Sequence, residues 1–269
     1  MVLIFAATLT PDDVMSHVGG AFATLWRICV YAVSIVLEAA PFVLAGSVAA
    51  MIAQRFAVGA IAAPVLTAFA PGCDCAMNGF AAALRRCGPA VAGMALTWGA
   101  VCNPIALIAT ATILGGHVLV ARLIGGGVAA AVLGLLWRTI RSAEKTDRHA
   151  HPPDPDIASH LEDGLRLLLP AAFLGSAALV LAPSALRAHD SPLLAALAGA
   201  LLSPCSTADP VLAKVLAASV SSQAAFVVAS QCADVRQLAL LWRHFGSRRA
   251  VLAAAAGAAG CVAALIAAR

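Results

Sequence analysis

Long apolar runs that end at Pro, Gly or Asn residues dominate this chain. Residues 25–54 are almost continuously apolar, which is enough for a helix to cross the roughly 30 Å hydrocarbon core of a bilayer. A second run of this kind covers 118–137. Strands of a membrane barrel alternate apolar and polar residues, whereas these runs are continuous and rich in Ala, Leu and Val. The pattern therefore predicts membrane-spanning helices.

Shorter apolar segments lie between these two runs, and each ends where a helix is expected to stop. They cover 57–70, 76–84 and 90–101, and a last one ends at Leu114. Because most are about half a membrane long, we expect short or broken helices near the bilayer midplane. Re-entrant hairpins and tilted full crossings are both open for these segments.

The polar segment 138–166 divides the chain into two apolar halves. It holds six of the thirteen acidic residues, and Arg138, Arg141 and Lys145 closely follow the preceding span. Basic residues beside a span favour the cytoplasmic side of a membrane. We therefore predict a polar cytoplasmic linker at 141–162.

Landmarks of the first half recur in the second half in the same order. The stretch "EAAPFVLAGS" at 38–47 resembles "LLLPAAFLGS" at 167–176. The further aligned pairs are Cys73 with Cys205, Asn103 with Asp234, and Gly115 with Gly246. Such an ordered series indicates an internal duplication, which is typical of secondary transporters.

We therefore predict an all-α polytopic membrane protein with two pseudo-symmetric helical repeats and with broken or short helices at the midplane. An N-terminal lead-in covers 1–24, the first membrane repeat 25–140, the linker 141–162 and the second membrane repeat 163–269. Whether the repeats are parallel or inverted depends on how many segments cross the bilayer fully.

The composition excludes several other classes of protein. Hydrophobic residues make up 62% of the 269 residues and charged residues only 11%, whereas a soluble domain carries about 25% charged residues. The net charge of +4 is too small to indicate nucleic-acid binding. The sequence has no P-loop pattern, no Gly-rich dinucleotide fingerprint and no His-Glu-x-x-His motif. We expect no enzyme activity and no cofactor, with the lipid bilayer and a small solute as partners.

The first break of the apolar pattern contains two thiols and a carboxylate, Cys73, Asp74 and Cys75. A helix break frees backbone groups that lipid cannot satisfy, so such breaks face protein or a watery cavity. Paired breaks at matching places in two halves indicate the binding site of a transporter. We therefore expect a substrate site that is lined by Cys73, Cys75, Cys205, Cys102, Cys232 and Asn103.

Soft sulfur ligands suit a thiophilic guest such as trivalent arsenic or antimony, Cu(I) or mercury. We assign no fixed metal site, but Cys73, Cys75 and Cys205 would be the ligands if the substrate is a soft metal. The alternative is that the cysteines are inert, because Cys is a common small apolar residue in membrane helices. For Cys29, Cys87 and Cys261 we favour this alternative.

Carboxylates within or beside apolar segments are costly in lipid and usually face a cavity, a partner or an ion path. Glu38 lies in the middle of the first span and has no opposite charge near it in the sequence. Alternatively, Glu38 is a neutral structural carboxyl group, or it pairs with a basic group such as Lys214. We expect proton coupling, or a polar lining of the path, from Glu38, Asp74, Asp209 and Asp234.

The stretch "PGCDCAMNGFAAALRRCGPAVAGMALTWGAVCNPIAL", together with the later "SPCSTADPVLAKVL", resembles the predicted-permease family that includes the organoarsenical efflux permeases. This resemblance implies a multi-pass permease of the bacterial inner membrane, and some members of the family export trivalent organoarsenicals by way of Cys thiols. The chain departs from the family in its Cys-Asp-Cys motif, in Cys87 between Arg86 and Gly88, and in a second copy without a second thiol. The extra carboxylate beside the thiols would favour a cationic guest over a neutral arsenical.

We predict a permease that exports a small thiophilic solute through a Cys-lined site at the midplane. The first alternative is a membrane-embedded thiol redox or metal-handling protein that does not transport. In that case Cys73 and Cys75 would cycle between dithiol and disulfide or pass on a metal. The second alternative is an assembly or anchoring subunit of a larger complex.

Overall fold

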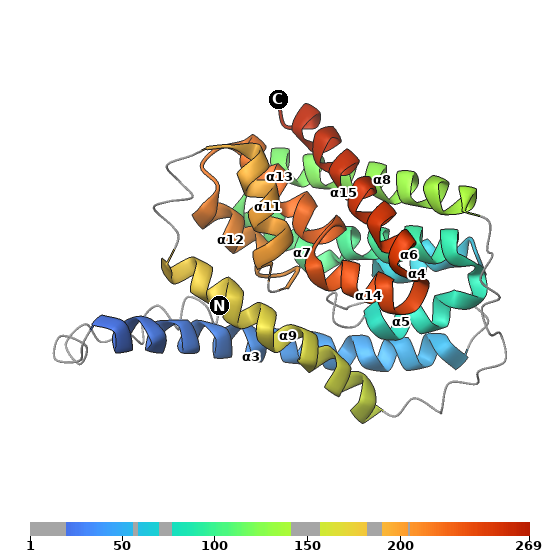
Figure 1. The fold of residues 1–269 in the computed structure, drawn as a ribbon, viewed down its shortest axis with the longest axis horizontal. Helices are drawn as coiled ribbons and strands as arrows, with labels where there is room; N and C mark the ends of the chain where they lie inside the picture. Colours follow the sequence, from blue (N-terminus) through green and yellow to red (C-terminus); the bar gives the residue numbers. More distant parts are fainter. Residues whose placement is uncertain (1–19, 56–58, 70–76, 141–156, 182–189, 204) are drawn as a thin grey trace.

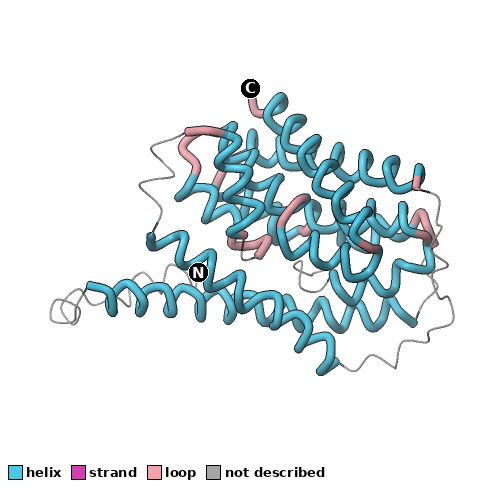
Figure 2. The backbone as a smooth tube through the Cα atoms, in the orientation of Figure 1, coloured by secondary structure: helices cyan, strands magenta, loops and turns pink. Residues whose placement is uncertain are grey.

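The computed structural model describes residues 20–55, 59–69, 77–140, 157–181, 190–203 and 205–269. All regular secondary structure in these segments is helical (Figure 2). The expectation of an all-α protein is therefore confirmed for the part of the chain that the structure describes.

The helices of the first half alternate between long and short ones (Figure 1). They are α3 (Gly20–Arg55), α4 (Ala62–Phe69), α5 (Met77–Leu84), the short 3-10 helix η1 (Arg85–Cys87), α6 (Pro89–Cys102), α7 (Pro104–Ile113) and α8 (Gly116–Thr139). The first helix begins at Gly20, within the segment expected as a lead-in.

The second half has a similar order of long and short helices. They are α9 (Ile157–Leu181), α11 (Pro192–Leu202), α12 (Asp209–Leu216), α13 (Val220–Cys232), α14 (Val235–Phe245) and α15 (Ser247–Ala267). Because α9 begins at Ile157, the last part of the segment expected as a linker is helical.

Several of these helices are long and apolar enough to cross a membrane. Five segments qualify among the described residues, namely 20–49, 116–139, 164–181, 220–245 and 247–267. The α6–α7 pair, which is bent by 42° at its break, brings the number up to six. The chain is therefore a multi-pass membrane protein by the length and composition of its helices.

The helix breaks lie where Asn, Asp and Gly residues interrupt the apolar pattern. Asn103 ends α6 and caps α7, and in the second half Asp234 caps α14 directly after Ala233 ends α13. Gly115 and Gly246 have φ angles of 91° and 90°, a region that L side chains rarely adopt. Each of these glycines turns the chain from a short helix into a long one.

The helices form three layers in Figure 1. Helices α3 and α9 pack together and run in opposite directions along one side, and α8 and α15 pack together, also in opposite directions, on the other side. The shorter helices lie between them, and every residue of α13 from Ser222 to Cys232 is buried. The exposed apolar residues of α3 fit a helix that faces lipid.

Candidate functional site

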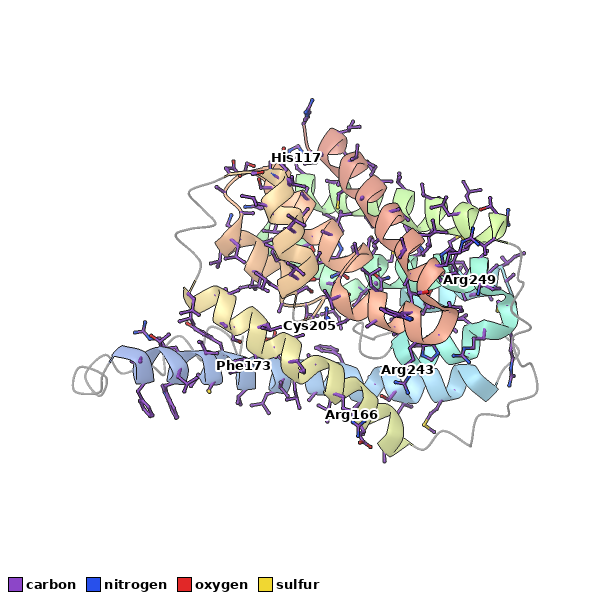
Figure 3. The ribbon with its side chains drawn as sticks, in the orientation of Figure 1. His117, Arg166, Phe173, Cys205, Arg243 and Arg249 are labelled. Carbon is purple, nitrogen blue, oxygen red and sulfur yellow. The ribbon has the colours of Figure 1, made fainter. Side chains whose placement is uncertain are left out.

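Cys205 lies between α11 and α12, at one of the helix breaks of the second half. Its side chain is only 2% exposed, and its Sγ atom lies 3.1 Å from Thr207 Oγ1. It packs in one cluster with apolar residues of α3 and α9, among them Ile35 and Leu168. Figure 3 shows Cys205 between the α3–α9 pair and the short helices. Cys73, Asp74 and Cys75 lie outside the described residues.

The other two cysteines expected at the site pack in a different place. Cys232 is buried in a cluster with Val101 and Val228, and Cys102 packs against this cluster. Cys205 is not a member of it. Among the residues that the structure describes, no group of three or more His, Cys, Asp or Glu side chains could hold a metal ion. The described thiols therefore do not form a preassembled metal centre.

Asp209 is the most deeply buried carboxylate at the break. It is the first residue of α12, and its side chain is inaccessible to solvent. Ser203 Oγ donates a hydrogen bond to its Oδ1 at 2.7 Å, and Gln231 Nε2 donates to its Oδ2 at 2.5 Å. The break thus brings the end of α11, the start of α12 and the end of α13 together around one carboxyl group.

Asp234 and Arg236 extend this polar cluster to the start of α14. Asp234 caps the helix, because its Oδ1 accepts a hydrogen bond from Gln237 N at 2.5 Å. Its Oδ2 accepts from Arg236 Nε at 2.9 Å and from Nη2 at 2.5 Å. The same Nη2 donates to Ser203 Oγ at 3.0 Å, so the Ser203 hydroxyl links Arg236 to Asp209. We call Ser203, Asp209, Gln231, Asp234 and Arg236 the polar cluster.

Some polar atoms near the break have no hydrogen-bond partner among the described residues. They are Ser206 Oγ, Gln231 Oε1 and Gln237 Oε1, and all three side chains are at least nine-tenths buried. The amide nitrogen of Gln237 faces Thr97 Oγ1 of α6 at 3.4 Å. A buried polar atom that lacks a partner is unfavourable by about 1–3 kcal/mol. A polar guest, or water, that reached the break would relieve this deficit.

The break between α6 and α7 in the first half is stabilised by Asn103 and Arg122. Asn103 Oδ1 accepts a hydrogen bond from Ile105 N at 3.1 Å and so caps α7. The guanidinium of Arg122, which is fully buried on α8, donates to the carbonyl oxygens of Val101 at 3.1 Å and Ala100 at 3.3 Å. It also donates to Thr110 Oγ1 at 3.0 Å, on the other side of the break. Arg122 therefore satisfies backbone acceptors that the interrupted helix frees.

Glu38 lies apart from the polar cluster. It is half-buried on α3, between Ile35 and Ala39, which pack against α9. Among the described residues its carboxylate makes no hydrogen bond and no ion pair. The structure therefore places Asp209 and Asp234 in one network and Glu38 outside it.

Arg122 and Arg236 are the main site residues that the sequence analysis did not identify. Arg122 lies within the apolar run 118–137, and a charge in such a run is a signal that could have found it. Arg236 comes two residues after Asp234, and its link to Ser203 depends on a contact between helices. No pattern along the sequence indicates that contact.

A separate polar contact joins α11 to α13 at the start of both helices. The Asp190 carboxylate accepts hydrogen bonds from Ser222 Oγ at 2.6 Å, from Ser219 Oγ at 3.0 Å and from Ser219 N at 3.3 Å. The Ser222 hydroxyl, followed by Ser219, lowers the pKa of Asp190 below its ordinary value. Ser219 is itself the cap of α13.

We expect Asp190→Asn to lower the melting temperature at neutral pH by about 2–4 °C, because one hydrogen-bonded charge is lost. The lowered pKa means that ionised Asp190 stabilises the fold above the ordinary Asp pKa, and that this contribution disappears as pH falls through the lowered value. The difference in melting temperature between Asp190→Asn and wild type should therefore become smaller at acidic pH. Melting curves against pH check this, with Glu162→Gln as a surface control. A difference that stays constant down to pH values of about 3 would contradict it.

Comparison with known proteins finds no matching family model, no similar curated protein and no similar solved structure.

Proposed function

We propose that this chain is a multi-pass permease of the bacterial inner membrane that exports a small thiophilic solute. The observation that carries the proposal is the break between α11 and α12, where a buried thiol, Cys205, lies next to a polar cluster inside an apolar bundle. Ionisable residues inside a membrane protein are costly and usually mark the path of a substrate or an ion. The sequence resemblance to the predicted permeases agrees with this proposal.

We further propose that the two halves are inverted repeats. The order of helix lengths, the caps at Asn103 and Asp234, and the positive φ angles of Gly115 and Gly246 support this relation. The opposite directions of α3 and α9, and of α8 and α15, support inversion in particular (Figure 1). In inverted-repeat transporters the substrate binds near the midplane, between the repeats.

In the proposed site, Cys205 binds the solute together with Cys73 and Cys75 of the first break. Cys102, Cys232 and Asn103 lie beside the second pair of breaks and line the path when one half rocks against the other. The polar cluster is closed to water here, since Asp209 and Asp234 are at most 1% exposed. We therefore propose that this conformation is an occluded state of the transporter.

A resistance panel in bacteria without their own exporters tests the proposal. Cells with wild type should grow better than cells without the protein on at least one of arsenite, methylated arsenicals, antimonite, copper or mercury. Cys73→Ser and Cys205→Ser should reduce that resistance to the level of cells without the protein, because serine oxygen is a poor ligand for soft guests.

Cys29→Ser is the matched control, because Cys29 is exposed on α3 and is not expected at the site. It should keep full resistance. The proposal fails if no compound of the panel distinguishes cells with and without wild type. It also fails if Cys73→Ser and Cys205→Ser resist as well as Cys29→Ser at equal protein levels.

A further inference from the structure

The polar cluster has two carboxyl groups and one guanidinium, and only one of the carboxyl groups forms an ion pair among the described residues. Arg236 forms an ion pair with Asp234, in which Nη2 lies 2.5 Å from Oδ2. Asp209 has no such partner among the described residues, because its two oxygen atoms accept hydrogen bonds from the neutral groups of Ser203 and Gln231. With both carboxyl groups ionised, the cluster would hold a net charge of about −1 from two carboxylates and one guanidinium.

An isolated carboxylate in the interior of a membrane protein is strongly unfavourable. A proton or a monovalent cation could neutralise Asp209. The oxygen atoms of Asp209 already accept hydrogen bonds from Ser203 and Gln231, and among the described residues no group of three or more His, Cys, Asp or Glu side chains could hold a metal ion beside it. A proton needs no additional space, since a carboxylic acid is nearly the same size as a carboxylate.

We propose that Asp209 is the proton-binding group of the transport cycle, neutral in the occluded state and ionised when the break opens to water. This inference rests on the proposed function, because it assigns the coupling to the same site. The step is a simple acid dissociation, in which the O–H bond of the carboxylic acid breaks and the proton passes to water. The electron pair stays on the carboxylate, and no oxidant or reductant takes part.

Ser203 and Arg236 give the ionisation a structural consequence. Arg236 Nη2 lies 3.0 Å from Ser203 Oγ, which lies 2.7 Å from Asp209 Oδ1. When Asp209 loses its proton, its negative charge competes with Asp234 for the guanidinium. Asp234 also caps α14, so a shift of Arg236 toward Asp209 loosens the start of that helix. Deprotonation at α12 is thereby transmitted to α14.

The surroundings of Asp209 contain few other titratable groups. The helices that pack on α12 are α7, α9, α11 and α13. Helices α7 and α11 carry no ionisable side chain, and α13 carries only Cys232. The ionisable residues of α9 are confined to its first turns, between His160 and Arg166. Among the described residues, Asp234 and Arg236 at the start of α14 and the thiol of Cys205 are the other titratable groups near it, and Lys214 of α12 itself is exposed.

The other described carboxylates expected to couple protons fit this role less well. Asp234 is held by Arg236 and by the first turn of α14, so its charge is already balanced. Glu38 has no polar contact among the described residues that would transmit a change of charge. Asp209 alone of these three combines complete burial with a hydrogen-bonded link to a neighbouring helix.

Infrared titration of the purified full-length protein tests the proton site without any substrate. Wild type should show the C=O band of a buried carboxylic acid that disappears as pH rises. Asp209→Asn should lack this band yet fold, because asparagine matches the neutral acid in size and keeps an acceptor for Ser203. Lys214→Gln, an exposed change on the same helix, should retain the band. An unchanged band in Asp209→Asn overturns the proposal.

Liposomes that contain the protein and arsenite as probe test the coupling. A pH gradient should drive arsenite movement by wild type, and Asp209→Asn should lose this driven component while it still exchanges arsenite across the membrane. Gradient-driven movement by Asp209→Asn, or movement by wild type that needs Na⁺ and ignores pH, overturns the proposal. If wild type moves no arsenite but its Asp209 band titrates, the proposed substrate fails and the proton site is supported.

Discussion

Arg122→Leu is expected to leave no stable folded protein in the membrane. The guanidinium is fully buried and donates to Val101 O, Ala100 O and Thr110 Oγ1 across the break of the α6–α7 pair. Leucine would leave these acceptors buried without a donor, at several kcal/mol each for backbone groups in lipid. Since folded domains are stable by only about 5–15 kcal/mol, this loss is a large part of the total.

The yield of monodisperse protein in detergent, and its melting temperature, measure the effect of Arg122→Leu. Arg138→Leu is the matched control, because Arg138 lies on the same helix but is exposed in its last turn. It should be close to wild type in both measurements. Wild-type yield and melting temperature for Arg122→Leu would show that the guanidinium does not hold the break.

The second large effect is expected for Gly125→Ala, where α8 crosses α15. A Cβ atom at Gly125 would lie 2.7 Å from Gly260 O and 2.8 Å from the Cβ of Ala264. Both helices would have to move apart, because the first of these atoms belongs to the backbone. Overpacking of this kind costs about 1–3 kcal/mol, and we expect a clearly lower melting temperature.

Gly134→Ala on the same helix provides the control for Gly125→Ala. The three described atoms nearest to a Cβ atom at Gly134 all belong to Met94, and the nearest of them lies at 3.5 Å, which is an ordinary contact. Alanine also favours a helix over glycine by about 1 kcal/mol, so Gly134→Ala should melt at or above the wild-type temperature. Equal melting temperatures for the two variants would contradict the close crossing of α8 and α15.

The helices and their breaks could be predicted from the sequence because they depend on local chemistry. Asn103 followed by Pro104 is a helix cap followed by a residue suited to the first helical turn, and the structure has α7 begin there. Gly115 supplies the positive φ angle that starts α8. These residues act on their own neighbours, so no knowledge of the fold is needed.

The contacts of the site could not be predicted, because they join segments that are far apart in the chain. Asp209 meets Gln231, and Arg236 meets Ser203, only after α11, α12, α13 and α14 have packed together. Chemically similar groups can also differ in their burial and contacts, which the sequence does not show. Glu38 and Asp209 are both carboxylates beside apolar runs, but only Asp209 has neighbours that hydrogen-bond to it among the described residues.

Transport by purified protein in liposomes tests the central proposal most directly. We predict that wild type moves arsenite or another thiophilic solute of the panel across the membrane faster than protein-free liposomes do, and that Cys205→Ser abolishes this excess while Cys29→Ser keeps it. Rates for wild type equal to those of protein-free liposomes, for every solute of the panel, would contradict the assignment of this chain as a thiophile permease.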